Sequence, residues 1–530
     1  RFPNNHHDPN SLAAQSPLSG FFLDKNLLWI GTSMGLSTFD IKTHTLQNIE
    51  PFNSDFKGYQ SPYLKDKQGN HWLSNEKGIL IVNNIKHGFQ KYTNEEDNPK
   101  SLSTNAGMLG VDSKGTVYVL HESGVDVLNQ NKERIKTLKL SPLEVHGFEM
   151  PTCFLEDKAG KLFFVGTKAY TISTDGNELV NAFPGDELPT MGYTSDLFLD
   201  AENTIWYAGH SLNVYNTKYQ DFDRYEPNGE GNFAGNQVAS VLELSPGHLL
   251  LGGVWDGLIL FDTKDRKYTK RYPIGERNGT HGTTVAVNKI FRSKDQKIWL
   301  GSNYGLALFD PVKESFQHYG PEHGLPSNAV YCILEDEHQH LWLSTANGIS
   351  RFDPTTESFR NFDFLDGLQG NEFYEHHAAI KHPITGELWF SGPGGVTVFH
   401  PDSITENTYI PPVLFTKLIY YNKNKNNGQP IIDNAVYNKD KLRFSYQDNI
   451  IEFHFTALNF VSPQKNKYAY RLTGFNDDWV QLGTKHEVSF TNLSPGTYTL
   501  QVKASNNDGI WNEEGASLNI YIMPPWYRTW

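Results

Sequence analysis

Short apolar runs alternate with glycine-containing turns along most of the chain. The clearest example spans residues 341–353, where the apolar runs Leu341–Leu343 and Ile349–Phe352 flank the pair Asn347-Gly348. Asn-Gly favours the positive φ that a tight turn between antiparallel strands requires. An isolated hairpin cannot bury its faces in water, so this segment predicts one part of a larger sheet structure.

The same pattern occurs nine times in the sequence. Its period is roughly 40 to 50 residues, as expected for one four-stranded blade of a β-propeller. The first apolar strand of each copy begins near Trp29, Trp72, Val117, Leu162, Ile205, Leu249, Ile298, Leu341 and Leu388. Several copies also carry an Asp-x-x-Gly turn just before this strand, most clearly at Asp66, Asp112 and Asp157. The sequence therefore predicts an all-β fold containing a β-propeller.

The last repeat lacks a fourth strand. It offers strands near residues 373–381, 388–391 and 395–399 and then leaves the pattern at His400-Pro401. An unpaired edge strand is a liability, and propellers usually close by exchanging a strand. Another part of the chain is therefore expected to complete this sheet.

Two arrangements of the nine repeats are consistent with this requirement. In the first, seven repeats over residues 88–405 form the ring and Gly88–Tyr92 supplies the closing strand. Residues 1–87 are then two repeats left from a preceding propeller. In the second, a single larger ring is closed by the N-terminal segment. Residues 1–12 align without gaps on residues 91–102, so the chain is expected to begin part-way through a repeat as a processed or truncated piece.

A different strand-rich unit follows Pro411-Pro412. Its apolar and polar residues alternate as in half-buried strands, at residues 442–446, 450–455, 468–472, 488–490 and 498–502. Turn signals at Pro495-Gly496 and at residues 507–509 separate some of these runs. About seven strands in about 110 residues suit an immunoglobulin-like β-sandwich, which we expect over residues 411–523, followed by a terminal segment at residues 524–530.

Charge and cysteine content narrow the classes of function. The formal net charge is -14 at pH 7, and phosphate binding needs clustered Lys and Arg, so nucleic acid is not an expected partner. No run approaches the roughly 20 apolar residues that cross a bilayer. Cys153 and Cys332 occupy equivalent repeat positions in non-neighbouring blades. Such positions lie far apart, so we expect two buried thiols and not a disulfide.

Several motifs resemble those of a known family. The repeat Trp-Ile-Gly-Thr-x-x-Gly-Leu, seen at residues 29–36, resembles the regulator propeller repeats of bacterial sensor proteins. Tyr468-x-Tyr470-Arg471-Leu472, continuing through Trp479 to Tyr498, resembles the triple-tyrosine domain that follows them. The terminal segment, residues 524–530, resembles that family's approach to its membrane helix.

The resemblance implies the extracytoplasmic sensor region of a hybrid two-component system type regulator that controls polysaccharide use. It implies a periplasmic location, an inner-membrane anchor after residue 530, a homodimer and an oligosaccharide ligand. Related ectodomains usually carry two seven-bladed propellers, whereas this chain has nine repeats and contains no kinase, receiver or DNA-binding module. We therefore expect no enzymatic activity and no cofactor for this chain, and its output domain lies outside the sequence.

Departures from the repeat pattern mark the candidate ligand-binding residues. Trp255 and Asp256 lie in the loop between two strands of one repeat, and Asn303 and Tyr304 lie at the matching place in the next. Neighbouring loops on one propeller face would offer an aromatic platform to a sugar ring and polar groups to its hydroxyls. Ordinary surface variation also explains these residues, and it is more frequent than ligand binding at such positions.

Two further functions compete with ligand sensing. A glycan-cleaving enzyme would need paired carboxylates, but the pairs Glu156-Asp157 and Glu335-Asp336 recur at matching repeat positions, which favours a role in turns. The histidines of residues 371–377 are adjacent, and adjacent strand residues point to opposite faces, so no metal site is predicted. We find no nucleophile motif and predict no catalytic residue. A structural module that docks another protein is the third possibility.

Overall fold

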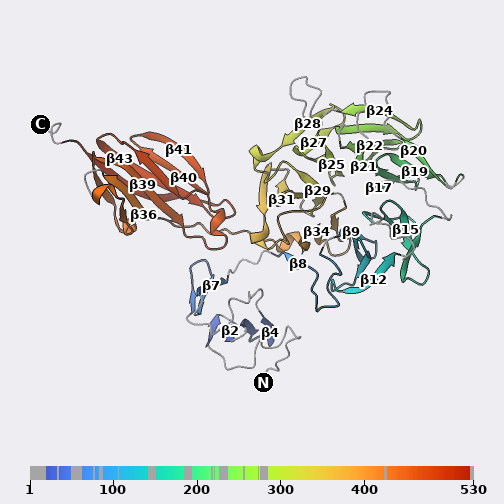
Figure 1. Ribbon diagram of the computed structural model, residues 1–530, viewed down its shortest axis with the longest axis horizontal. Coiled ribbons are helices and arrows are strands. Elements are labelled where there is room, and N and C mark those ends of the chain that lie inside the picture. The colour runs from blue at the N-terminus through green and yellow to red at the C-terminus, as the bar shows by residue number, and fades with distance from the viewer. Residues whose placement is uncertain are drawn as a thin grey trace. The chain divides into compact units, whose positions relative to one another are not determined.

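The computed structural model divides the chain into two compact units, residues 1–86 with 405–530 and residues 87–404. Regular structure in its described part consists of β-strands and short 3₁₀ helices (Figure 1). The residues that the structure describes are 20–24, 26–32, 35–48, 63–75, 78–82, 88–105, 107–140, 151–183, 194–216, 219, 221–225, 237–254, 257–272, 274, 285–375, 377–422 and 426–525.

The unit of residues 87–404 is built from antiparallel groups of four strands arranged around a common centre (Figure 1). The first two groups are joined into one eight-stranded sheet by parallel pairing of their fourth strands. Six groups are consecutive in sequence, as in a propeller. Their strands are β9 (Met108–Val111), β10 (Val117–His121), β11 (Gly124–Leu128), β12 (Arg134–Leu140), β13 (Cys153–Glu156), β14 (Leu162–Val165), β15 (Ala169–Ile172), β16 (Glu178–Asn181), β17 (Thr194–Leu199), β18 (Ile205–Gly209), β19 (Leu212–Asn216), β20 (Asp221–Tyr225), β21 (Val238–Ser245), β22 (His248–Gly253), β23 (Gly257–Asp262), β24 (Lys267–Tyr272), β25 (Val287–Arg292), β26 (Ile298–Ser302), β27 (Gly305–Asp310), β28 (Ser315–Tyr319), β29 (Val330–Glu335), β30 (Leu341–Thr345), β31 (Gly348–Asp353) and β32 (Ser358–Phe362).

The last group takes its fourth strand from the beginning of the unit. β33 (Ala379–Lys381), β34 (Leu388–Gly392) and β35 (Gly395–Phe399) are completed by β8 (Gln90–Tyr92), which pairs antiparallel with β35. This is the strand that the seven-repeat arrangement requires. The first strands of successive groups contact one another from β9 through β33, and β33 contacts β9 in turn.

Aromatic packing accompanies this closure. Phe89 makes edge-to-face contacts with Phe362 and Phe399, at 5.3 and 4.8 Å between ring centroids. Tyr92 stacks on Trp389 with a centroid distance of 6.0 Å. Phe89, directly before β8, therefore packs in the core between the last two groups, and Tyr92 packs in the core between the last group and the first. β8 also forms backbone hydrogen bonds with the sheet edge.

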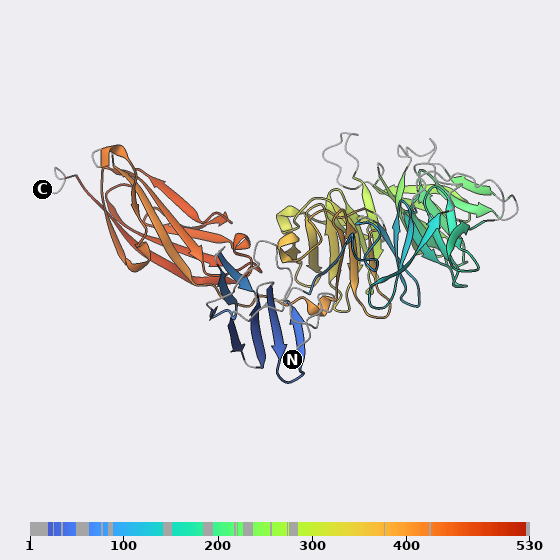
Figure 2. The same ribbon diagram turned by 60° about the horizontal axis from the view of Figure 1, so that its bottom comes forward.

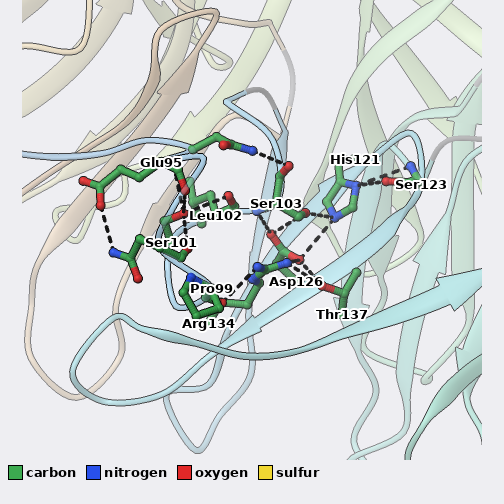
Figure 3. A network of polar contacts seen from close by, with 12 residues as sticks. Glu95, Pro99, Ser101, Leu102, Ser103, His121, Ser123, Asp126, Arg134 and Thr137 are labelled. Carbon is green, nitrogen blue, oxygen red and sulfur yellow. Dashed lines mark hydrogen bonds and ion pairs between the residues drawn. The ribbon is translucent and has the colours of Figure 1, made fainter.

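A buried polar network holds the chain segment that follows β8 (Figure 3). Asp126 on β11 accepts hydrogen bonds from the backbone N–H and the hydroxyl of Ser103, both at 2.7 Å, and from the Thr137 hydroxyl at 2.6 Å. His121 on β10 also contacts Ser103, with 3.0 Å between Nε2 and Oγ. Burial would raise the pKa of Asp126, but hydrogen bonds from His121, Thr137 and Ser103 lower it to about 2. The connection from the closing strand to β9 is thus fixed by a carboxylate of the first group.

The Asp turns noticed in the sequence have a shared structure. In the turn at Asp336, Oδ1 accepts the backbone N–H groups of residues 338 and 340, both at 2.9 Å. Oδ2 accepts the indole N–H of Trp342 at 2.9 Å. Asp112 and Asp200 make the same set of bonds, to Tyr118 and Trp206 respectively. Each of these carboxylates fixes its turn and satisfies the polar atom of an aromatic side chain buried between sheets.

The C-terminal unit contains two packed sheets with strand orders β37-β36-β39-β42 and β38-β44-β43-β40-β41. The sequence predicted about seven strands, and the described part contains these nine. The five runs named from the sequence correspond to β38, β39, β40, β42 and β43, and the structure adds β36, β37, β41 and β44. Their apolar faces enclose one core that includes Phe453, Tyr468 and Leu500. The strands are β36 (Val413–Asn422), β37 (Ile431–Asp433), β38 (Lys441–Ser445), β39 (Asp448–Ala457), β40 (Tyr468–Thr473), β41 (Asn476–Gly483), β42 (Glu487–Thr491), β43 (Gly496–Ser505) and β44 (Trp511–Met523).

The two N-terminal repeats form small sheets of their own, drawn in blue in Figures 1 and 2. The first is a four-stranded sheet of order β1-β2-β3-β4 and the second a three-stranded sheet of order β5-β6-β7. Their strands are β1 (Gly20–Asp24), β2 (Leu27–Thr32), β3 (Gly35–Asp40), β4 (Thr45–Asn48), β5 (Tyr63–Lys65), β6 (His71–Asn75) and β7 (Gly78–Val82).

Short 3₁₀ helices lie in the connections. They are η2 (Pro321–His323), η3 (Phe364–Asp366), η4 (Pro401–Ser403), η5 (Asn426–Gly428), η6 (Val436–Asn438) and η7 (Pro463–Lys465). One sequence prediction is corrected here: the strand expected near residues 373–381 begins only at Ala379. Phe373 precedes it and is nevertheless buried in the core of the last group.

Removal of an aromatic ring at the closing strand tests the role of closure. We expect Phe89→Ala to lower the free energy of unfolding by about 2 kcal/mol, less than a fully buried Phe, because Phe89 is only partly buried. Urea unfolding followed by tryptophan fluorescence measures the change. Val312→Ala, at a side chain that is 90% exposed, is the control and should change the value by less than about 0.5 kcal/mol. Equal effects of the two variants would contradict the proposed role of Phe89.

Candidate functional site: a charged cluster on the innermost strands

At one equivalent position of successive repeats, the first strand of the group carries a polar side chain. Asp196, Ser240, Lys289 and Cys332 lie on β17, β21, β25 and β29, and each follows a register shift in the pairing with the second strand. A β-bulge re-aims the side chains next to it and is typical of functional positions. The repeated bulge thus brings chemically different residues to one level of the ring.

Asp196 is the acceptor at the middle of this cluster. Its carboxylate receives hydrogen bonds from His377 Nε2 at 2.8 Å and from Lys289 Nζ at 3.4 Å. The Ser240 hydroxyl and the backbone N–H of Val241 donate to it at 3.0 Å each, and its neighbour Leu197 donates its N–H at 3.1 Å. The side chain of Asp196 is 4% exposed. We call Asp196, Lys289 and His377 the central cluster.

The charges of the central cluster stabilise one another. Burial would raise the pKa of Asp196, but the Lys289 charge and the hydrogen bond from His377 hold it well below its ordinary value. Burial would lower the pKa of Lys289, and the Asp196 carboxylate raises it above its ordinary value. Burial likewise opposes protonation of His377, yet the Cys153 sulfur and Asp196 raise its pKa to about 10. Near neutral pH Asp196 is therefore ionised and Lys289 and His377 are protonated, with the sulfur of Cys153 as a further neighbour of both cations.

Both cysteines belong to the same surroundings. Cys153 and Cys332 are buried and neither forms a disulfide. Burial raises the pKa of the Cys332 thiol to about 11, so this thiol stays neutral beside Lys289. The sequence analysis identified Cys153 and Cys332 as equivalent repeat positions but did not compare the same position in the other repeats. That comparison would have shown Asp196 and Lys289 there and would have identified the cluster.

The predicted ligand-binding residues are only partly described. Trp255 and Asp256 lie outside the described residues. Asn303 has a structural contact, because its side-chain oxygen accepts the backbone N–H of Ala286 at 3.0 Å. Tyr304 is 40% exposed, and its ring stacks on His318 with 4.2 Å between centroids. The structure therefore offers one half-exposed aromatic pair at the turn between β26 and β27.

Glu322 adds a carboxylate beside this aromatic pair. Its Oε1 lies 3.6 Å from His318 Nδ1 and 3.2 Å from His323 Nδ1. The His323 ring also makes an edge-to-face contact with the Tyr319 ring, with 5.8 Å between the centroids. The turn thus combines an aromatic surface with groups that donate and accept hydrogen bonds.

Groups that resemble catalytic sets have structural roles. Ser103, His121 and Asp126 have the composition of a hydrolase triad, but the carboxylate and the serine both approach His121 Nε2, and Ser123 contacts Nδ1. In a working triad the carboxylate orients the imidazole through Nδ1. His121 and Asp126 are also fully buried, so the set has no access to a substrate.

The other sequence candidates also have structural contacts. Asp157 and Asp336 fix turns, as predicted. On the outer strand β24 and in the turn before it, basic side chains also form ion pairs: Arg266 pairs with Asp223 at 3.0 Å and Lys270 pairs with Glu314 at 2.5 Å.

Two groupings were missed by the sequence analysis. Within residues 371–377, which were assigned a structural role, His377 belongs to the central cluster, and His376 lies outside the described residues. On one face of the C-terminal unit, Glu452, His454 and Glu487 bring ligand-type atoms within 4.8 Å of one another. His454 Nε2 lies 2.6 Å from Glu452 Oε1. Alternation along β39 and pairing with β42 explain this cross-strand group.

The pH dependence of stability tests the charge of His377. A pKa of about 10 in the folded protein, above the ordinary value near 6.5, gives stabilisation that is complete below pH 6.5 and lost as the pH rises through 10. We expect His377→Gln to remove this loss, which is on the order of a few kcal/mol. Urea unfolding at pH 6, 8 and 10 measures it. His248→Gln, at a more exposed histidine on β22, is the control, and parallel pH profiles of wild type and His377→Gln would contradict the assignment.

Comparison with known proteins identifies the parts of the chain. Residues 459–523 match the Y_Y_Y domain, and residues 324–347 match the two component regulator propeller. Histidine kinase P4 of Formosa agariphila is 27% identical over a match that covers 78% of this chain and 34% of that protein. The chain thus spans about a third of the length of this curated relative.

A solved structure extends the similarity to the fold. The extracellular domain of the putative hybrid two component system BT3049 from B. thetaiotaomicron has a TM-score of 0.78 and 22% identity, over 96% of this chain and 68% of that one. Among the described residues, no helix has the length and apolar character needed to cross a membrane. The chain therefore contains a match to the two component regulator propeller at residues 324–347 and a match to the Y_Y_Y domain at residues 459–523, and it shares its fold with the extracellular domain of a hybrid two component system.

Proposed function

We propose that this chain is the ligand-sensing extracytoplasmic region of a transmembrane signalling regulator. The observation that carries this proposal is the order of its parts, regulator propeller repeats followed by a Y_Y_Y domain. The similarity to a histidine kinase supports a cytoplasmic kinase as the output. The region would lie in the periplasm, anchored to the inner membrane by a segment after residue 530.

The domain limits belong to the same proposal. Residues 88–405 form a seven-bladed propeller, residues 411–523 form the sandwich and residues 524–530 lead to the membrane. Residues 1–87 are two repeats of a preceding propeller. The pairing of β8 with β35 supports the start of the ring, and the division between residues 404 and 405 supports its end.

The ligand we propose is an oligosaccharide derived from a polysaccharide. The stacked pair of Tyr304 and His318, beside Glu322, supports this ligand because sugar rings stack on aromatic faces while their hydroxyls take polar partners. Trp255, Asp256 and Asn303 remain proposed members of this surface. The chain binds its ligand without converting it. In the carboxylate pairs considered for catalysis, Asp157 and Asp336 are engaged in turns, and Glu156 and Glu335 accept hydrogen bonds from Ser113 and Lys294.

Signalling requires that the ligand distinguish two states. We propose that two chains form a homodimer and that the ligand favours one relative placement of the two. Binding that is equal in both placements would transmit nothing. The sandwich lies last in the chain, so it would pass the change to the membrane segment.

A melting-temperature screen against defined oligosaccharides tests ligand sensing. We expect one glycan class to raise the melting temperature saturably, by an amount equivalent to about 2.7 kcal/mol at a hundredfold excess over Kd. The mass of each ligand is checked afterwards, and shortened ligand would establish an enzyme and contradict the proposal.

A variant at the aromatic pair locates the binding surface. We expect Tyr304→Ala to weaken binding roughly tenfold, as loss of one stacking contact does. Tyr437→Ala is the matched control, because Tyr437 on η6 is an exposed tyrosine in the other unit. An equal affinity of Tyr304→Ala and wild type would remove Tyr304 from the site and leave the sensing proposal intact.

A further inference from the structure

In the central cluster, the acceptor positions of the Asp196 carboxylate are occupied, whereas the Lys289 ammonium has more donors than it uses in the cluster. A carboxylate offers about four acceptor positions, and Asp196 receives donors from Lys289, His377, Ser240, Val241 and Leu197. Its acceptor capacity is therefore used within the protein. Ser240 is also engaged twice, because its oxygen accepts the backbone N–H of Ile290 at 3.1 Å.

Lys289 has donor capacity beyond its bond to Asp196. An ammonium group carries three N–H donors, and in the described part of the chain Lys289 has one hydrogen-bond partner, Asp196, at the long distance of 3.4 Å. Its side chain is 28% exposed, and that of His377 is 17% exposed, against 4% for Asp196. Lys289 and His377 are therefore more exposed than Asp196, the carboxylate that they share.

This arrangement selects the chemistry of a ligand. A neutral sugar hydroxyl gains from both donors and acceptors, whereas Lys289 and His377 offer donors. An oxyanion only accepts hydrogen bonds, and it pairs with a cationic donor in a charge-assisted hydrogen bond. The neighbouring thiol of Cys332 is neutral near pH 7 and adds no competing negative charge.

We propose that the central cluster binds the carboxylate or sulfate group of an acidic saccharide, with the Lys289 ammonium as the main contact and His377 as the second cation. The inference rests on the proposed function, because it names the class of oligosaccharide that the propeller takes. Asp196 acts as a positioning residue that holds both cations in place. The Tyr304 surface presents an aromatic face to a sugar ring, whereas the central cluster presents charged donors.

Calorimetric titration at pH 7 and low salt tests this proposal. The probes are trisaccharides of galacturonate, glucuronate and mannuronate, a sulfated galactan trisaccharide, the methyl-esterified form of each uronate trisaccharide, and sodium sulfate. We expect at least one acidic trisaccharide to bind and its uncharged ester to bind at least tenfold more weakly. The affinity should also fall with rising salt, since the contact is a charge pair.

Variants of Lys289 assign the contact. Lys289→Met keeps the length of the side chain and removes its charge, and we expect at least a tenfold weaker affinity. Lys289→Arg restores the charge and should recover the affinity to within about threefold. Lys270→Met, at a lysine on the outer strand β24, is the matched control and should leave binding unchanged. The melting temperature of each variant verifies that it is folded.

Each remaining outcome either supports or overturns the proposed site. Undiminished binding of the acidic trisaccharide by Lys289→Met would overturn the proposal, as would the absence of binding by every acidic probe. Binding of sulfate ion without any acidic saccharide would leave a site for free anions and overturn the saccharide assignment. If a neutral oligosaccharide stabilises wild type and Lys289→Met equally, the sensing function holds and this inference fails. Acidic binding that Lys289→Met loses, without a shortened ligand, supports both.

Discussion

The pairing of β8 with β35 is the contact on which the ring of sheets depends, because it joins the first residues of the unit to the last. Each sheet in such a ring buries both faces against its neighbours, so a missing outer strand would leave an apolar edge in water. Phe89 and Tyr92 fill that position with aromatic packing. The buried network around Asp126 then fixes the connection to β9. Closure is thus achieved by apolar packing, sheet pairing and a satisfied carboxylate in succession.

Closure also creates the central cluster. His377 and Asp196 are separated by 181 positions in sequence, yet their side chains lie 2.8 Å apart. His377 precedes the first strand of the last group, and Asp196 lies on the first strand of the third, so the two meet only when the innermost strands face one another. Burying these charges is costly unless they are paired. The cluster therefore links the stability of the ring to the ionisation of groups contributed by several sheets.

The buried carboxylates differ from the cationic partners of Asp196 in how fully their hydrogen-bonding positions are occupied. Those of the repeated turns, such as Asp336, are saturated by backbone N–H groups and an indole, and Asp126 and Asp196 are saturated by side chains and backbone. A carboxylate whose acceptor positions are all occupied is a poor general base or nucleophile, because activation requires an available lone pair near the substrate. The cationic partners of Asp196 keep donor capacity and accessibility. This asymmetry favours ligand binding over hydrolysis at the ring's centre.

The sequence by itself determined the repeated strand-turn-strand unit, the need for another segment to complete the last sheet, the Asp turns and the separate sandwich, while the choice of residues 88–92 as the closing segment came from the structure. The features that the sequence determined depend on local rules, namely alternation, turn residues and a fixed period, which neighbouring residues express. The central cluster was decided only by the tertiary structure. Asp196 and Lys289 show no motif because each occupies an ordinary strand position in a different repeat, and His377 lies before the first strand of the last group. Their chemistry arises from the repeated β-bulge and from ring closure, which bring distant charges within hydrogen-bonding distance and remove them from water.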